Sequence, residues 1–332
     1  MTRAGDASHT ASRALDQAFG AGAAASTATA PGQVTLVGEH VDYVGGHVAC
    51  MAVDLALTVA VRPSRDGWWR AAGLASSAAV ILAAAVAILR LAGRRLAAEE
   101  LLAIALTAER DVVGVPCGDL DQRAIVHARP GEVLALDCAS GARRSVAWPW
   151  PTVALVVAAS GECHDVGGRE YRRRREAAES ACAALGVSTC PEIGDRWREL
   201  EPGLLPRGRH IATETLRAAA AVRALEVGDV AALGRLMDES HESLRSDCEV
   251  STDRLDAMVA AARGVPGCHG ARLVGAGFGG SIVALVEQGA AKACAAALAA
   301  VSGLDGVTWL VRPAAGLEVT AADVVGGEEG GF

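Results

Sequence analysis

The sequence predicts an α+β protein made of two domains. Strand-like and helix-like segments are mixed along its 332 residues, 51% of which are hydrophobic. Aromatic residues contribute only 3%, so the cores must be built from Ala, Val and Leu. The run WPWP at residues 148–151 marks the predicted boundary, because two prolines in four residues continue neither a helix nor a strand. We therefore expect domains at residues 1–150 and 151–332.

The first half is expected to combine short strands with helices. Leu15 and Phe19 have the i, i+4 spacing of an amphipathic helix over residues 11–19, and GAGAAASTAT at residues 20–29 is typical of a flexible link. Gly45 and Gly46 mark a turn between two apolar runs. The other predicted elements are strands at 33–38, 47–53, 55–62, 68–71, 132–137 and 143–147, helices at 73–91, 97–111 and 120–128, and turns at 63–67 and 114–119.

The second half is expected to open with a strand and to be helical in its middle. The run PTVALVVAAS at residues 151–160 is almost entirely apolar, which indicates a buried strand. Four helices are predicted next, and then two strands joined by the glycine-rich loop GAGFGG at residues 275–280. The helices span 168–185, 210–226, 229–246 and 251–263, and the strands span 271–274 and 281–286.

Composition limits the partners and the compartment. The net charge of −8 argues against nucleic acid or an anionic membrane as a partner. Nine cysteines without a CxxC pair indicate free thiols in a reducing compartment. The N-terminus has no apolar signal region, and the apolar stretch at residues 78–89 is too short to span a bilayer. We expect a cytoplasmic monomer without a nucleic-acid or membrane partner.

The first candidate site lies within residues 30–54, APGQVTLVGEHVDYVGGHVACMAVD. Glu39, His40 and Asp42 follow an apolar run directly and precede the two turn glycines. Carboxylates and an imidazole at the end of a strand are typical of a binding surface. The alternative interpretation is a solvated hairpin whose polar residues have no functional role.

A second motif, GLASSAAV, spans residues 73–80. A glycine-led loop that turns into a helix presents free backbone N–H groups, which together with the helix dipole favour a phosphate. The hydroxyls of Ser76 and Ser77 add ligands for phosphate or Mg²⁺. The lysine of a Walker A motif is absent. An ordinary capped helix start is the alternative.

Two carboxylates and a glycine-rich loop complete the candidate chemistry. Asp121 follows the loop GVPCGD at the start of a predicted helix, where it could orient or deprotonate a hydroxyl group. Glu109 is predicted near the end of the preceding helix, where its charge opposes the helix dipole unless a cation lies beside it. A capping Asp121 and a solvated Glu109 are the alternative. The loop at 275–280 lets backbone approach a ligand, or forms a wide hairpin.

Together these motifs resemble the GHMP kinases, and within them most closely the galactokinases. The matching segments occur in the same order, as GEHVDYVGG, GLASSAA, GVPCGDLDQ and GARLVGAGFGG. The segment from His210 to Asp256 and the helix near residue 170 are also similar to this family. The resemblance implies a two-domain α+β GHMP kinase fold. Its N-terminal domain would resemble ribosomal protein S5 domain 2 and its C-terminal domain would be ferredoxin-like, with the active site in the cleft between them.

The resemblance also implies phosphoryl transfer from Mg²⁺-ATP to the anomeric hydroxyl of galactose or a related sugar. Asp121 matches the catalytic aspartate. The other implied roles are sugar binding by Glu39, His40, Asp42, Gly118 and Tyr171, phosphate binding by Gly73, Leu74, Ala75, Ser76, Ser77, Ala78 and Ala79, and Mg²⁺ binding by Ser76 and Glu109.

Two departures from the family pattern bear on activity. Gln33 stands where the family has its catalytic arginine, so a hydrogen-bond donor replaces a charge. Only ten residues, from Pro63 to Ala72, lie between the predicted strand at 55–62 and Gly73, where galactokinases have tens of residues that help to hold the nucleotide base. We therefore expect weaker ATP binding. A sugar-binding sensor with little kinase activity is the main alternative, and another GHMP activity such as homoserine or mevalonate phosphorylation is a further one.

Overall fold

The computed structural model describes residues 7–20, 26–63, 69–72, 77–162, 169–303 and 308–317, and folds them into two antiparallel sheets with helices on both. The strands are β1 (Ser26–Val37), β2 (His47–Pro63), β3 (Trp69–Ala72), β4 (Glu132–Asp137), β5 (Arg143–Ala147), β6 (Val153–Ala159), β7 (Cys268–Val274), β8 (Ser281–Glu287) and β9 (Thr308–Val311). The helices are α1 (Ala7–Phe19), α2 (Ser77–Leu91), α3 (Ala98–Thr107), α4 (Leu120–His127), α5 (Arg169–Ala184), α6 (Leu205–Val227), α7 (Val230–Ser246), α8 (Asp253–Arg263) and α9 (Ala291–Ser302).

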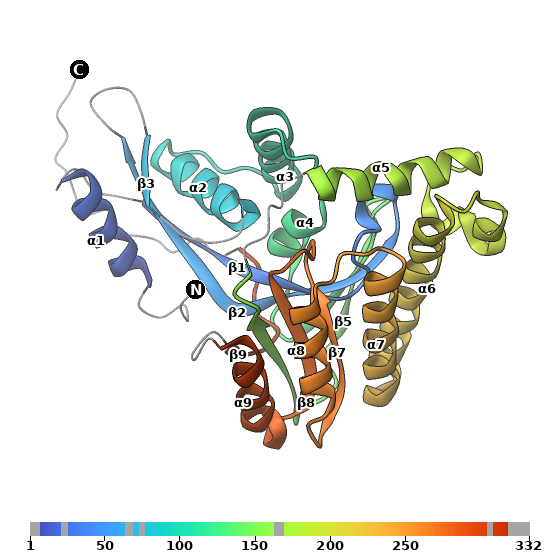
Figure 1. Cartoon of the computed structure of the whole chain (residues 1–332). Coiled ribbons are helices and arrows are strands. Elements are labelled where there is room, and N and C mark those ends of the chain that lie inside the picture. Colours follow the sequence, from blue (N-terminus) through green and yellow to red (C-terminus); the bar gives the residue numbers. More distant parts are fainter. Residues whose placement is uncertain are drawn as a thin grey trace, which may run out of the picture.

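The first sheet has the order β1-β2-β4-β5, with β3 also paired to β2. Its long strands β1 and β2 are buried over most of their length because both faces are covered. Small residues of β1, such as Ala28 and Ala30, pack with Leu82 of α2 and Ile125 of α4. Figure 1 shows α2 and α4 on one side of this sheet and the second sheet on the other. The first turn of α4 is thereby held against the sheet.

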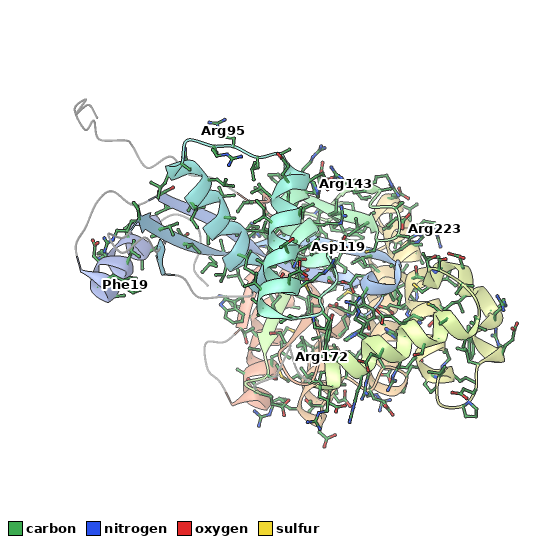
Figure 2. The ribbon with its side chains drawn as sticks, turned by 90° about the horizontal axis from the view of Figure 1, so that it is seen from above. Phe19, Arg95, Asp119, Arg143, Arg172 and Arg223 are labelled. Carbon is green, nitrogen blue, oxygen red and sulfur yellow. The ribbon has the colours of Figure 1, made fainter. Side chains whose placement is uncertain are left out.

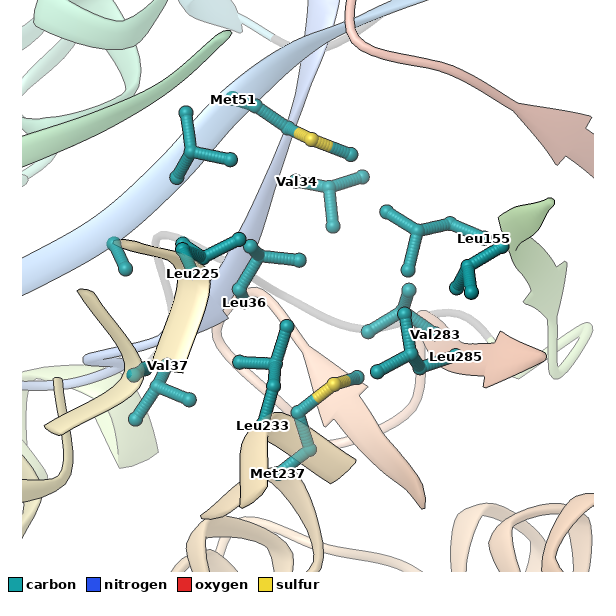
Figure 3. Close-up of a cluster of buried hydrophobic side chains, with 14 of the residues drawn as sticks. Val34, Leu36, Val37, Met51, Leu155, Leu225, Leu233, Met237, Val283 and Leu285 are labelled. Atoms are coloured by element: carbon teal, nitrogen blue, oxygen red, sulfur yellow. The ribbon is translucent and has the colours of Figure 1, made fainter. Parts of the chain in front are cut away.

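The second sheet has the order β7-β8-β6-β9. Alternate residues of its strands point to opposite faces, as the pleat requires. Leu155 and Val283 join Val34 and Met51 of the first sheet in one buried cluster that also includes residues of α6 and α7 (Figure 3). The opposite face packs against α8 and α9. The two sheets therefore share their largest hydrophobic core, which fixes their relative position.

Several predicted elements need correction. Residues 26–29 are not part of a flexible link: they begin β1 and are buried, and Thr29 Oγ1 lies 2.8 Å from Thr58 Oγ1 of β2. The predicted strands at 47–53 and 55–62 form one strand, with a register shift opposite Pro31 and Gly32 at the point where they were divided. The helix predicted to reach residue 111 changes at residue 108 into a π-helix, Ala108–Val113.

Two strands of the first sheet have the bounds that were predicted, and some other elements were not predicted. The strands β4 and β5 have the predicted bounds, and the first sheet ends at Ala147 while the second begins at Val153. The sequence patterns did not indicate the 3₁₀ helix Cys190–Glu199, helix α9 or strand β9. The turn predicted at 63–67 lies outside the described residues apart from Pro63.

Two further features concern the placement of arginines and the apolar character of the helices. The arginines labelled in Figure 2, Arg95, Arg143, Arg172 and Arg223, lie on separate parts of the molecule. Within the described part of the chain, no helix is both long enough and apolar enough to cross a membrane.

Candidate active site

A pocket of about 640 Å³, its open mouth included, lies where the end of β1, the start of α4, helix α5 and the loop after β7 meet. Seven of the predicted site residues line it, and they come from both halves of the chain. Its lining consists of Glu39, His40, Asp42, Tyr43, Glu109, Val115, Cys117, Gly118, Leu120, Asp121, Gln122, Tyr171, Gly275 and Ala276. Another predicted site residue, Gln33, does not line the pocket but donates a hydrogen bond to Asp121, which does.

Asp121 lies in the first turn of α4 and accepts a hydrogen bond from Gln33 of β1. The distance from Gln33 Nε2 to Asp121 Oδ1 is 2.7 Å. Burial, reinforced by the charges of Asp42 and Glu109, raises the pKa of Asp121 to about 7, while the hydrogen bond from Gln33 opposes this rise. A carboxyl group with this pKa can take up a proton near neutral pH, as a general base must. Gln33 orients the group without adding a charge.

Glu39 is buried and is held by the loop after β7. Its Oε1 accepts a hydrogen bond of 2.7 Å from the Gly275 N–H and lies 3.5 Å from Nη2 of Arg272. Burial raises the pKa of Glu39 to about 7, and the charge of Arg272 opposes this rise. Arg272 is itself fully buried and also donates to the carbonyl of Thr35 at 3.2 Å. The arginine therefore favours the ionised form of Glu39, which can accept hydrogen bonds from hydroxyl groups.

His40 adopts a left-handed backbone conformation with φ of 60°, and protein groups contact both of its ring nitrogens. Nε2 lies 3.0 Å from the Ala276 carbonyl and Nδ1 lies 3.0 Å from the Tyr43 hydroxyl. Burial lowers the pKa of His40 to about 3, so the ring is neutral. Nε2 must then carry the hydrogen and donate a hydrogen bond to the Ala276 carbonyl, while Nδ1 accepts a hydrogen bond from the Tyr43 hydroxyl. The His40 ring therefore links the segment that contains Glu39, His40 and Asp42 to the loop after β7.

Asp42 packs against the backbone of Gly118. Burial and the charge of Asp119 raise the pKa of Asp42 to about 6. A Cβ atom placed on Gly118 would lie 1.6 Å from Oδ2 of Asp42, so only glycine leaves room for the carboxylate there. Tyr171 of α5 lines the same pocket as Asp42, and the centroid of its ring lies 6.2 Å from the ring centroid of Tyr43. The glycine thus allows Asp42 to face the pocket.

We expect Gly118→Ala to lower sugar affinity about 10- to 100-fold, because displacing a binding carboxylate by about 1 Å is costly. Calorimetric titration with galactose would measure this. Gly289→Ala is the matched control, since a Cβ atom at Gly289 meets no atom within 4 Å. Unchanged affinity in a folded Gly118→Ala protein would show that Asp42 does not contact the sugar.

Glu109 is buried within the π-helix that follows α3, a local irregularity that often occurs at functional sites. Its Oε2 accepts hydrogen bonds from the Gln122 side-chain amide and, at 3.9 Å, from the Cys117 thiol. Glu109 and Asp121 line the same pocket and offer the oxygen ligands that Mg²⁺ prefers. Glu109 could therefore be one ligand of a magnesium ion, although the described residues contain no group of three His, Cys, Asp or Glu side chains arranged for a metal.

The predicted phosphate loop is described only in part. Gly73, Leu74, Ala75 and Ser76 lie outside the described residues, and α2 begins at Ser77. Ala78 and Ala79 are buried in the core beneath β1 and β2, so a ligand could reach only their backbone. Trp68 also lies outside the described residues.

Some residues that shape the site were not predicted. Arg272, Glu214 and His210 contact the segment at residues 35–39 from the second half of the chain. Gln122 holds Glu109. Arg272 and Gln122 belong to motifs that the sequence made visible, so their position within GARLVGAGFGG and GVPCGDLDQ was the available signal.

Family comparisons agree with the geometry. Residues 14–63 match the galactokinase galactose-binding signature, residues 52–129 match the GHMP kinase N-terminal domain, and residues 221–302 match the GHMP kinase C-terminal domain. A galactokinase from Roseiflexus sp. is 35% identical over 324 residues, covering 78% of this chain and 83% of the relative. The galactokinase from Homo sapiens is 31% identical over 347 residues, covering 85% and 88%.

Solved structures show the same fold. Lactococcus lactis galactokinase complexed with galactose superimposes with a TM-score of 0.84 at 21% identity, covering 93% of this chain and 98% of that one. The Methanococcus jannaschii mevalonate kinase superimposes with a TM-score of 0.62 at 16% identity, covering 87% and 98%. The architecture is therefore the two-domain α+β fold of the GHMP kinases.

Proposed function

We propose a mechanism of ATP-dependent sugar phosphorylation for this chain. The chain belongs to the galactokinase family of the GHMP kinase superfamily. The proposed substrate is galactose or a closely related sugar, and the proposed acceptor is its anomeric hydroxyl. The observation that carries the proposal is the pocket itself, in which Asp121, with its pKa of about 7, lies among the polar groups of the galactose-binding signature.

Asp121 is proposed to orient the anomeric hydroxyl and to accept its proton. The sugar oxygen forms a bond to the γ-phosphorus of ATP, the bond from that phosphorus to the bridging oxygen breaks, and ADP leaves. Such a transfer depends mainly on positioning and on stabilising charge. The hydrogen bond from Gln33 fixes the Asp121 carboxylate for this step.

Glu39, Asp42, Gly118 and Tyr171 are proposed to bind the sugar, and His40 is proposed to shape the segment that carries Glu39 and Asp42. The carboxylates of Glu39 and Asp42 would accept hydrogen bonds from hydroxyl groups, and such a site rejects analogues that lack a hydroxyl. Gly118 would present backbone and leave space. Both ring nitrogens of His40 contact protein atoms, so the proposed contribution of His40 is to shape the segment.

ATP is proposed to bind at residues 73–79, at the N-terminus of α2. Glu109 and Ser76 would hold Mg²⁺, which neutralises phosphate charge when it is bound. Gln122 supports this by orienting the Glu109 carboxylate.

We also propose that the chain consists of two domains, residues 1–150 and residues 151–332. We propose that it acts as a monomer. The pocket needs both halves, because Tyr171, Gly275 and Ala276 line it together with residues of the first half. The shared core of the two sheets supports the expectation that neither half folds well alone. Sedimentation of the full chain would check the monomer.

The direct test is transfer of labelled γ-phosphate from Mg²⁺-ATP to a panel of sugars, together with calorimetry of galactose alone. We expect a galactose product labelled at the anomeric position. Galactose binding without transfer at high protein concentration would contradict a kinase and favour the sensor. Phosphorylation of homoserine or mevalonate instead would contradict the sugar site.

The rate should depend on pH through Asp121. Because its pKa in the folded protein is about 7, the carboxylate needed as a base forms as the pH rises through that value. We expect kcat/KM to rise about tenfold from pH 6 to pH 8, and more steeply if ionised Glu39 is also required. Initial rates in buffers of constant ionic strength would measure this. A flat profile over this range would show that Asp121 is not the base.

A further inference from the structure

One face of α6 holds the backbone of the sugar-binding segment. Glu214 Oε1 accepts a hydrogen bond of 2.8 Å from the Gly38 N–H. His210 lies one helical turn earlier on the same face, with its Nε2 atom 3.1 Å from the carbonyl of Glu39. The two contacts are made on either side of the Glu39 side chain. Together they restrict how that residue can turn relative to the pocket.

Glu214 is itself firmly fixed. Its side chain has no exposed surface, and it also accepts hydrogen bonds from Ser240 at 2.6 Å and Arg217 at 2.8 Å. Although burial acts in the opposite direction, the charges of Arg217 and His210 lower the pKa of Glu214 to about 2. An ionised acceptor with three donors holds the Gly38 amide more strongly than a neutral one would.

The backbone at Gly38 takes a conformation that only glycine adopts readily. Its φ is 115°, and a Cβ atom there would lie 2.8 Å from the His47 carbonyl oxygen. His40, two residues later, is also left-handed. Glycine adopts its conformation without strain, but a left-handed histidine persists only where surrounding contacts hold it. Glu39, between them, is directed into the pocket, where Gly275 and Arg272 contact its carboxylate.

We propose that Glu214 is a positioning residue for sugar binding, which holds the Gly38 amide and thereby sets the place of the Glu39 carboxylate. The inference rests on the proposed function of the pocket. Glu214 does not line the pocket, so it acts through Glu39 and not on the sugar or on ATP.

Glu214→Gln tests this by replacing the ionised acceptor with a neutral amide of the same size. We expect KM for galactose to rise about tenfold or more, KM for ATP to stay within twofold, and hydrogen exchange at the Gly38 amide to accelerate. Glu226→Gln is the matched control, because it makes the same charge change on α6, where Glu226 pairs with Arg144. An unchanged KM for galactose in a folded Glu214→Gln protein would overturn the proposal.

Arg217→Met separates positioning from general stability. It removes the ion-pair partner of Glu214 and leaves the acceptor of the Gly38 amide in place. If Glu214 acts by positioning, KM for galactose should rise less in Arg217→Met than in Glu214→Gln, even when both variants lose a similar amount of Tm. If KM rises equally in the two variants and only in proportion to their loss of Tm, the proposal is overturned. If Glu214→Gln does not fold, Ser240→Ala is tested instead, because it removes another hydrogen bond to Glu214. We then expect KM for galactose to rise several-fold, and an unchanged KM would contradict the proposal.

The wild-type protein separates this inference from the proposed function. A wild-type protein that neither binds nor phosphorylates galactose would overturn the proposed function, and the sugar role of Glu214 with it. Galactose phosphorylation combined with an unprotected Gly38 amide would overturn the role of Glu214 alone.

Discussion

Replacing Gln33 with arginine is expected to raise kcat about 10²- to 10³-fold, which is the usual effect of one well-placed group that stabilises charge in a transition state. Gln33 Nε2 already lies 2.7 Å from Asp121 Oδ1, so a longer guanidinium at this position of β1 would place a positive charge beside the proposed catalytic carboxylate. A fixed positive charge there stabilises the negative charge that develops on the phosphoryl oxygens. The amide of Gln33 offers only a weaker, neutral hydrogen bond.

The same substitution should move the pH dependence. Asp121 has a raised pKa because it is buried and lies near the carboxylates of Asp42 and Glu109. A neighbouring cation favours the ionised form, so the rising limb of kcat/KM against pH should move below 7, by about one pH unit or more. Gln33→Met, which removes the amide but keeps the size, should move the limb the other way and lower kcat. Rates that are flat or lower in folded Gln33→Arg would show that position 33 does not limit turnover.

The local parts of the site could be predicted because they are coded by short motifs. Glu39, His40 and Asp42 lie within four residues, and Asp121 follows its glycine loop, so the sequence alone placed acid groups beside strand and helix ends. The strands β4 and β5 were equally visible, because their patterns are bounded by turn residues. These features depend on neighbours in the chain.

The supporting contacts could not be predicted, because they join distant residues. Gly38 and Glu214 are 176 residues apart, and Arg272 and Thr35 are 237 apart. A glutamate within a helical pattern gives no sign that it will be fully buried against a strand end. Residues 26–29 had the opposite problem: their small polar side chains are typical of a link, but pairing with β2 and covering by α2 make them a strand. Tertiary packing overrides local preference in both cases.

Asp121→Asn is expected to lower kcat about 10²- to 10⁴-fold and to leave galactose binding within a few-fold of wild type. The amide keeps the size of the carboxylate, and its oxygen can still accept the hydrogen bond from Gln33, but it cannot take a proton from the sugar. Calorimetry and single-turnover transfer from labelled ATP would measure the two effects separately. Retained binding with lost transfer would assign Asp121 to the chemical step.

Stability provides an independent readout of the same substitution. The pKa of Asp121 is raised from 3.8 to about 7, so its ionisation favours the unfolded chain. The wild-type protein therefore loses stability relative to Asp121→Asn as the pH rises from about 4 to 7, with no further loss above 7. We expect the Tm of Asp121→Asn to exceed that of wild type by a margin that grows over this range. An equal transfer rate in the two proteins would exclude Asp121 as the base, and a constant Tm difference would exclude its raised pKa.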